Sequence, residues 1–238
     1  MKRFNASAAR LCLPTFEEGD LLKCIRELLR LDADWVPDRD GYSMYMRPFM
    51  FSTTPWLGLT QCTEANLYVL LSPVGPYFKS GFKPIKLYVD EEYTRAWPGG
   101  TGHVKAAGNY GPTVAPQIQA ARAGCSQALF VHDKEKLWIT EAGTMNIFFI
   151  FINEDGEKEM VTPALDDETT LPGITRLSVI EICRGWGEFK VTERHIGVPE
   201  VAETIKAGRM FDSFGTGKAA ALQPISSFNW RVRRNTFH

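Results

Sequence analysis

The feature that most constrains this chain is a lysine in a glycine-rich turn, within Pro98-Gly99-Gly100-Thr101-Gly102-His103-Val104-Lys105-Ala106-Ala107-Gly108-Asn109-Tyr110-Gly111. A second run of small residues follows it, Thr140-Glu141-Ala142-Gly143-Thr144-Met145-Asn146. Small residues let a backbone come close to a ligand. The two runs therefore offer an amine (Lys105), a phenol (Tyr110) and a carboxylate (Glu141) at one candidate site.

These three groups suit an aldehyde cofactor. A lysine forms a Schiff base only as the neutral amine, so its surroundings must disfavour the charged form. Pyridoxal phosphate also needs an acid beside its ring nitrogen and a cradle for its phosphate. The pattern favours such a site, although a lysine taken alone is most often a solvated surface residue.

The composition argues against several other classes of protein. The chain has 238 residues and a formal net charge of −1, without the basic excess of a nucleic-acid-binding domain. The five cysteines are scattered, and with the four histidines they show no metal-ligand spacing. No apolar run is long enough to span a bilayer, and no targeting segment is visible. We expect no nucleic acid, membrane or metal partner, and a cytoplasmic location with the mitochondrion as the alternative.

The spacing of apolar residues predicts a mixed α+β chain. The first residues and Asp20 to Leu29 have helical periodicity, as do later segments starting near residues 117, 174 and 199. Strands are expected at 42–48, 66–71, 85–89, 128–131, 137–140, 146–151 and 158–162. The last four strands are expected to form an antiparallel set.

The chain resembles the branched-chain amino acid aminotransferases of the fold-type IV pyridoxal-phosphate class. Besides the lysine run, the matching runs are Arg10-Leu11-Cys12-Leu13-Pro14, Asp34-Trp35-Val36-Pro37, Tyr45-Met46-Arg47-Pro48, Ser72-Pro73-Val74-Gly75-Pro76-Tyr77-Phe78, Glu141 to Asn146, Leu171-Pro172-Gly173 and Trp186-Gly187-Glu188-Phe189. They reach from near the start to about Pro224, in the family's order. Any one run alone would be weak, but the ordered set is specific.

The resemblance implies an α+β, D-amino acid aminotransferase-like fold of two domains. We expect residues 1–78 to be a remnant of the smaller domain, 79–84 a linker and 85–238 most of the larger, cofactor-binding domain. Family members have further sequence before the equivalent of Met1 and a C-terminal helix beyond the equivalent of Ser227. We therefore expect a chain truncated at its N-terminus and altered at its C-terminus.

The activity implied is that of a transaminase in branched-chain amino acid metabolism and biosynthesis. It would transfer the amino group of leucine, isoleucine or valine to 2-oxoglutarate through a pyridoxal-phosphate Schiff base, as a homodimer. Two alternatives stay open. One is a truncated form with weak or no activity, and the other is a different fold-type IV enzyme, such as a D-amino acid transaminase or aminodeoxychorismate lyase.

By resemblance, Lys105 is the catalytic residue, binding the cofactor aldehyde and moving a proton between substrate Cα and cofactor C4′. Tyr110 would hydrogen-bond the cofactor's phenolic oxygen, and Glu141 would face its ring nitrogen. The cofactor-binding residues implied are Arg3, Lys105, Tyr110, Glu141, Thr144, Ile174, Thr175 and Lys218.

The phosphate cradle has two interpretations when the residues are taken alone. Pro172 and Gly173 open a helix whose free N–H groups suit an anion, but such a start is also common in ordinary helices. In a second loop, 214–220, the family usually carries threonine where this chain has Lys218. A lysine there neutralises phosphate or crowds a site built for a hydroxyl.

The resemblance also implies a substrate pocket that combines an arginine with apolar side chains. Its members would be Tyr45, Arg47, Leu57, Leu59, Tyr77, Thr144 and Ala219. Arg47 would favour the second carboxylate of glutamate, and the two leucines would favour branched aliphatic chains. Without the resemblance, Leu57 and Leu59 would be interpreted as core and Arg47 as a solvated strand residue.

Overall fold

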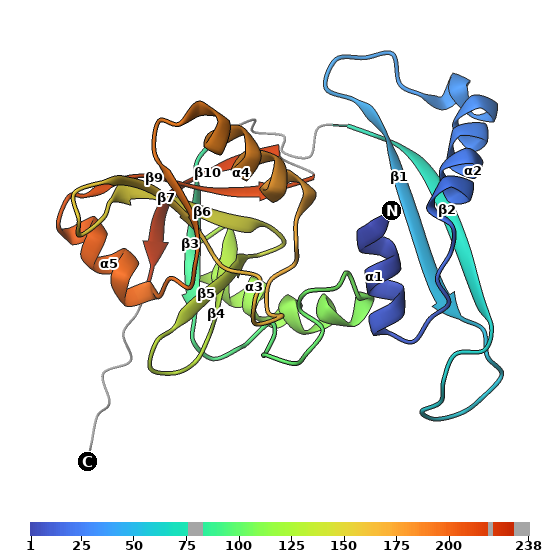
Figure 1. Ribbon diagram of the computed structural model, residues 1–238, viewed down its shortest axis with the longest axis horizontal. Helices are drawn as coiled ribbons and strands as arrows, with labels where there is room; N and C mark the ends of the chain where they lie inside the picture. The colour runs from blue at the N-terminus through green and yellow to red at the C-terminus, as the bar shows by residue number, and fades with distance from the viewer. Residues whose placement is uncertain (76–82, 219–220, 231–238) are drawn as a thin grey trace. The chain divides into compact units, whose positions relative to one another are not determined.

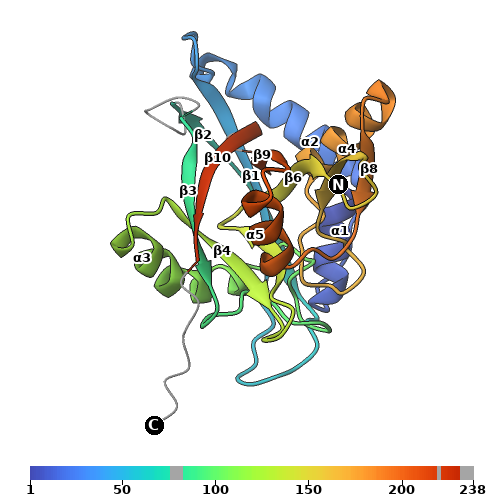
Figure 2. The same cartoon turned by 90° about the vertical axis from the view of Figure 1, so that its left-hand side faces the viewer.

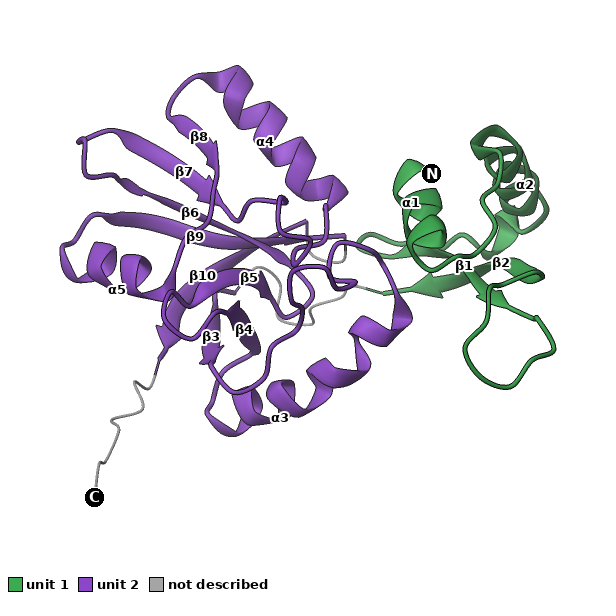
Figure 3. Cartoon of the chain, turned by 60° about the horizontal axis from the view of Figure 1, so that its bottom comes forward, with its two compact units in different colours: residues 1–81 green, residues 82–238 purple. Residues whose placement is uncertain are grey.

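The computed structural model describes residues 1–75, 83–218 and 221–230. The chain divides into two compact units, residues 1–81 (unit 1) and 82–238 (unit 2), which Figure 3 distinguishes by colour. Part of the linker expected at 79–84, together with Tyr77 and Ala219, lies outside the described residues.

Unit 1 consists of two helices and one antiparallel hairpin. The helices α1 (Lys2–Arg10) and α2 (Glu18–Leu31) precede a short 3₁₀ turn, Ala33–Trp35. The strands β1 (Ser43–Ser52) and β2 (Ala65–Val74) pair over their full length, from Ser43↔Val74 to Ser52↔Ala65. Both helices lie alongside this hairpin (Figure 1).

The sequence explains the helix and strands of unit 1. In α2, Leu21 and Ile25 are buried one turn apart, and acidic residues occupy the first turn where the helix dipole favours them. In β1, half-buried Met44 and Met46 alternate with exposed Tyr45, which is the period of two expected for a strand with one covered face. The predicted helices and strands of this unit are thus confirmed.

Unit 2 is built on a mixed, eight-stranded sheet. Its strands are β3 (Ile85–Asp90), β4 (Gln127–His132), β5 (Trp138–Ala142), β6 (Asn146–Ile152), β7 (Lys158–Thr162), β8 (Lys190–Glu193), β9 (Met210–Gly217) and β10 (Ala221–Asn229). They lie in the order β5-β4-β3-β10-β9-β6-β7-β8. Figure 2 shows β10, the last strand that the structure describes, running beside β3.

The four strands predicted to form an antiparallel set, β4 to β7, do pair antiparallel, but as two pairs that β3, β10 and β9 separate in the sheet. The pairs β4–β5, β6–β7 and β6–β9 are antiparallel, whereas β3–β4, β3–β10 and β7–β8 are parallel. Two of the parallel pairs have a helical crossover, as parallel neighbours need: α3 (Val114–Arg122) connects β3 to β4, and α4 (Ile174–Trp186) connects β7 to β8. The third pair, β3–β10, joins strands from the two ends of unit 2.

Apolar packing covers both faces of this sheet. In β6, Ile147, Phe149 and Phe151 join a core cluster that includes residues of α5 (Val198–Lys206), whereas Phe148 joins a cluster with α4. Burial on both faces accounts for the almost continuous apolar run of β6. Within the described parts of the chain, no helix is both long and apolar enough to cross a membrane.

Candidate active site

The lysine run forms a compact series of turns between β3 and α3. Lys105 is exposed, while its neighbours Val104 and Ala106 are buried and anchor the turn. Its Nζ lies 3.0 Å from the Tyr110 hydroxyl oxygen. The structure therefore brings the amine of an exposed lysine and the phenol into hydrogen-bonding contact.

Asn109 holds this turn from inside. Its Nδ2 donates to the carbonyl oxygens of Thr101 (2.7 Å) and Val104 (2.9 Å), and its Oδ1 accepts from the Thr101 hydroxyl at 2.7 Å. Asn109 is buried, so these bonds also satisfy a side chain that would otherwise be costly to bury. The backbone on both sides of Lys105 is thereby fixed.

Glu141 lies at the end of β5 and is 3% exposed. Its Oε1 accepts a hydrogen bond from the Leu171 backbone N–H at 2.8 Å. Its Oε2 lies 3.0 Å from Nε of Arg95, whose side chain is also buried. A buried carboxylate requires such partners, because an unpaired buried charge is strongly unfavourable.

Arg95 is a residue of this site that the sequence analysis missed. Besides Glu141, it donates to the carbonyl oxygens of Thr169 (Nη1, 3.0 Å) and Gly102 (Nη2, 3.5 Å). One guanidinium thus connects the lysine turn, the carboxylate and the segment of residues 166–171, here called the tether segment. A glutamate predicted to be buried needs a cationic side chain as its partner. No spacing in the sequence identifies Arg95 as that partner.

The N-terminus of α4 has no side-chain cap among the residues that the structure describes. Gly173 is the N-cap, and the first turn of the helix contains no acidic residue. Asn146 fixes the approach to it, because its Nδ2 donates to the Leu171 carbonyl oxygen at 2.8 Å. The backbone N–H groups of Ile174 and Thr175, at the start of α4, suit an anion in the way expected of a helix N-terminus.

Thr216 is the second residue that sequence reasoning did not single out. It pairs with Asn146 across β6 and β9 and is 1% exposed. Within the described ranges, its hydroxyl oxygen is buried without a hydrogen-bond partner. An unpaired hydroxyl beside the residue that fixes the α4 N-terminus fits a polar ligand such as a phosphate group.

The second phosphate loop, expected over residues 214–220, is mostly strand. Phe214 to Gly217 belong to β9, and exposed Lys218 occupies the turn that follows. Gly215, Thr216 and Gly217 are therefore strand residues and not part of a loop. Thr144 lies exposed in the turn between β5 and β6, close in sequence to Glu141.

The remaining candidate residues belong to unit 1. Arg3 lies in α1. Arg47 lies in β1, and its Nη2 is 3.5 Å from the hydroxyl oxygen of Tyr45. Leu57 and Leu59, in the connection between β1 and β2, have relative exposures of 99% and 105%. The interpretation of these two leucines as core residues is therefore wrong.

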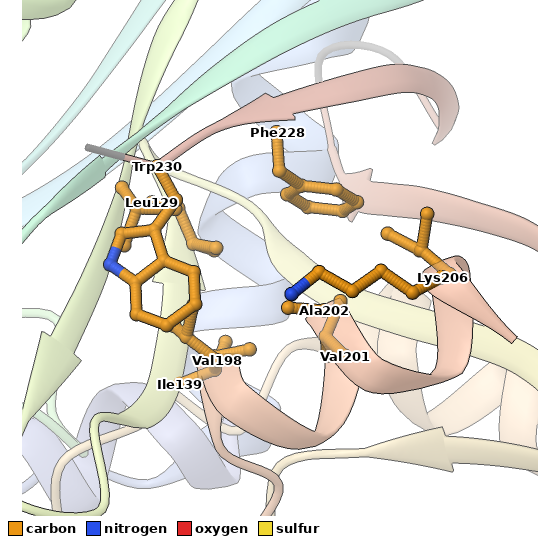
Figure 4. A pocket seen from close by; sticks show the side chains of 10 residues that line it. Leu129, Ile139, Val198, Val201, Ala202, Lys206, Phe228 and Trp230 are labelled. Carbon is orange, nitrogen blue, oxygen red and sulfur yellow. The ribbon is translucent and has the colours of Figure 1, made fainter. Parts of the chain in front are cut away.

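A separate apolar cavity of about 240 Å³ lies in unit 2, beside α5 (Figure 4). It is lined by Val89, Leu129, Ile139, Val198, Val201, Ala202, Ile205, Lys206, Phe228 and Trp230. None of the candidate cofactor or substrate residues is among these, so the cavity is distinct from the Lys105 site. Among the residues that the structure describes, no group of three or more His, Cys, Asp or Glu side chains is arranged to hold a metal ion.

Comparison with known proteins gives consistent matches along the chain. The model of the family Amino-transferase class IV matches residues 1–226. A branched-chain-amino-acid aminotransferase of Dictyostelium discoideum is 46% identical over 231 residues, covering 97% of this chain and 60% of the relative. The cytosolic enzyme of Mus musculus is 46% identical with the same two coverages. The mitochondrial enzyme of Saccharomyces cerevisiae is 47% identical, covering 97% of this chain and 59% of the relative. The chain thus spans about 60% of the length of these curated relatives.

Solved structures match the fold. The T.th. branched-chain amino acid aminotransferase, solved with pyridoxamine 5'-phosphate, is 26% identical with a TM-score of 0.75, covering 97% of this chain and 70% of that one. The Escherichia coli counterpart gives a TM-score of 0.77 at 22% identity, covering 96% of this chain and 69% of that one. At that lower identity the likeness concerns the fold alone.

Proposed function

The chain belongs to the class IV aminotransferase family, and from this premise we propose that it acts as a branched-chain amino acid transaminase dependent on pyridoxal phosphate. It would transfer the amino group of leucine, isoleucine or valine to 2-oxoglutarate. The observation that carries this proposal is the site in unit 2, where the Lys105 amine meets the Tyr110 phenol at 3.0 Å and Arg95 connects the lysine turn to buried Glu141. The predicted family and fold-type IV fold are confirmed by the family match and the solved structures.

The residues of unit 2 fit the cofactor. Pyridoxal phosphate, when bound, supplies an aldehyde and an electron-accepting ring that stabilises negative charge at the substrate Cα. Lys105 would hold the aldehyde carbon covalently and later move the proton at the substrate Cα. Tyr110 would orient the phenolic oxygen, and Glu141 would hold the ring-nitrogen proton. Glu141 suits this role because Leu171 and Arg95 fix both of its oxygens.

The phosphate would lie at the start of α4. Its contacts would be the N–H groups of Ile174 and Thr175, the unpaired hydroxyl of Thr216 and the side chain of Lys218. We further propose that Arg3 and Thr144 complete the set. The orphaned Thr216 hydroxyl supports this arrangement, because a bound phosphate oxygen would satisfy a group that is otherwise buried without a partner.

The substrate side pocket would come from residues with apolar and cationic side chains. We propose Tyr45, Arg47, Leu57, Leu59, Tyr77, Thr144 and Ala219 for this role. The complete exposure of Leu57 and Leu59 supports it, since exposed leucines remain available to cover a ligand.

The same proposal includes the division of the chain into a smaller domain (1–78), a linker (79–84) and a larger domain (85–238). It also includes a homodimer and a cytoplasmic location. The relatives include both cytosolic and mitochondrial forms.

Covalent labelling tests the proposal. The protein is incubated with pyridoxal phosphate, reduced with borohydride, digested and analysed by mass spectrometry, alongside Lys105→Ala and Lys136→Ala. We expect the label on Lys105, its loss only in Lys105→Ala, and amino transfer from leucine in a single-turnover assay. Labelling of another lysine would refute the assignment. A labelled protein that transfers no amino group would favour the alternative of an inactive form.

A further inference from the structure

The tether segment, residues 166–171, is held by contacts outside the proposed cofactor site. Asp167 Oδ1 accepts hydrogen bonds from both the backbone N–H (3.0 Å) and the hydroxyl (2.7 Å) of Thr169. Between them, Glu168 has a φ of +62°, a left-handed conformation that is unfavourable for a residue with a side chain. The two bonds to Asp167 therefore stabilise a turn whose backbone conformation is itself unfavourable.

This turn places the carbonyl group of Thr169 within hydrogen-bonding distance of Arg95. Thr169 is 1% exposed, and its carbonyl oxygen accepts from Arg95 Nη1 at 3.0 Å, while Nε of the same guanidinium lies 3.0 Å from Glu141 Oε2. Two residues after Thr169, the Leu171 N–H donates to the other oxygen of Glu141 at 2.8 Å. Both oxygens of Glu141 thus depend on the conformation of the tether segment.

The second oxygen of Asp167 faces the end of β4. His132 Nε2 lies 3.1 Å from Asp167 Oδ2. The orientation of the imidazole ring does not meet the geometry of a hydrogen bond between these two atoms. His195 Nδ1 approaches the same oxygen at 3.9 Å, and the Trp97 ring packs edge-on against His132 at 6.0 Å between centroids. Asp167 is therefore enclosed, with a side chain that is 15% exposed.

We propose that Asp167 is a positioning residue for Glu141, acting through Thr169 and Arg95. It does not touch the proposed cofactor; it fixes the turn that delivers the Thr169 carbonyl to Arg95 and the Leu171 N–H to Glu141. The inference rests on the proposed function, in which Glu141 faces the ring nitrogen. Such supporting residues hold the groups that contact a ligand in their working geometry.

Two variants at Asp167 and one at its neighbour test this role. Asp167→Ala removes the acceptor, and Asp167→Asn keeps an acceptor oxygen and serves as the conservative rescue. Asp166→Ala is the matched control, because Asp166 is adjacent, 67% exposed and contacts only His195 among the ion pairs of the described chain. Thr169→Val is nearly isosteric and removes only the hydroxyl group that donates to Asp167. If Asp167→Ala does not fold, this variant still tests the contact between Asp167 and Thr169.

The first measurement is amide hydrogen exchange in the cofactor-free protein. We expect peptides covering 166–173 to lose protection in Asp167→Ala and, to a lesser extent, in Thr169→Val, but to keep it in Asp167→Asn and Asp166→Ala. Unchanged exchange in both Asp167→Ala and Thr169→Val would overturn the positioning role, whether or not the protein binds a cofactor.

The second measurement is titration with pyridoxal phosphate, followed by the visible absorbance spectrum of the bound form. We expect Asp167→Ala to weaken binding on the order of tenfold and to shift the spectrum, with Asp167→Asn close to wild type. An equal effect of Asp166→Ala would overturn the inference. A wild-type protein that shows the expected exchange pattern but binds no pyridoxal phosphate would overturn the proposed function instead.

Discussion

Gly102 packs directly against the carbonyl oxygen of Thr169, so closely that a Cβ built on Gly102 would lie 2.6 Å from that oxygen. The same atom would lie 2.8 Å from the Glu168 carbonyl oxygen and 2.5 Å from the Ala96 Cβ. Two of these neighbours are backbone atoms, which cannot rotate away. The lysine turn fits against the tether segment only because residue 102 has no side chain.

Gly102→Ala should therefore separate the lysine turn from Glu141. We expect loss of pyridoxal-phosphate binding and a destabilisation of about 1–3 kcal/mol, the usual cost of overpacking a close contact. The matched control is Gly108→Ala, because a Cβ there would meet no atom within 4 Å. Thermal unfolding and cofactor titration measure both effects. Equal behaviour of the two variants would contradict the proposed fit.

Glu141→Gln should leave the cofactor bound but slow removal of the substrate Cα proton, by a factor on the order of a hundred, because a neutral amide cannot keep the ring nitrogen protonated. It would also leave the buried Arg95 charge without its carboxylate. The measurement is the rate of the half-reaction with leucine, with Glu135→Gln as the control because Glu135 is exposed. An unchanged half-reaction rate would exclude this role for Glu141.

Lys218→Thr tests the phosphate end of the site. We expect the wild-type chain to anchor phosphate less firmly than a threonine-bearing relative, and the substitution to tighten cofactor binding by a few-fold. A short hydroxyl would add a donor where an exposed lysine supplies only a point charge. Fluorescence titration with pyridoxal phosphate measures the change. Looser binding would show that Lys218 has itself taken over the anchoring.

Arg176→Ala should destabilise unit 2 without any contact to the proposed cofactor. Arg176 Nη2 lies 2.9 Å from Glu193 Oε2 and donates to the Pro163 carbonyl oxygen at 2.8 Å. Burial lowers the pKa of the Arg176 guanidinium, and Glu193 opposes that shift. Because truncation leaves the Pro163 carbonyl without this donor and Glu193 with Arg184 alone, we expect a loss of about 2 kcal/mol in the free energy of unfolding.

The control for this loss is Arg184→Ala. Arg184 Nη2 contacts the other oxygen of Glu193 at 3.1 Å, but the arginine side chain is 53% exposed. An exposed pair contributes at most about 1 kcal/mol. Urea unfolding of both variants gives the comparison, and a similar loss in each would show that the burial of Arg176 is not what matters.

The sequence predicts most of the elements that carry the proposed chemistry. The glycine-framed Lys105, the Thr140-to-Asn146 run and the helix beginning after Gly173 are local patterns, and the structure contains a turn, a strand end and a helix at these places. Local patterns are sufficient here because glycine content and apolar period directly restrict the backbone.

Other parts depend on contacts between residues far apart in the chain. The strands β9 and β10 are not predicted by local patterns, because Gly215, Gly217 and Pro224 disfavour strands when taken alone. Arg95 and Asp167 were missed for a related reason. Each acquires its importance from a partner, such as Glu141 or His132, that only the folded sheet brings near.

The strand order has a consequence for how the protein is made. Among the described strands, the ladder of β5, β4 and β3 is joined to that of β9, β6, β7 and β8 by β10, which pairs with β3 on one side and β9 on the other. During synthesis on the ribosome, β3 emerges long before β10, and contacts between such distant segments form slowly. The eight-stranded sheet therefore cannot close until residue 229 has left the exit tunnel. Until then, the nascent chain presents two unjoined half-sheets whose open edges chaperones would need to shield from other chains.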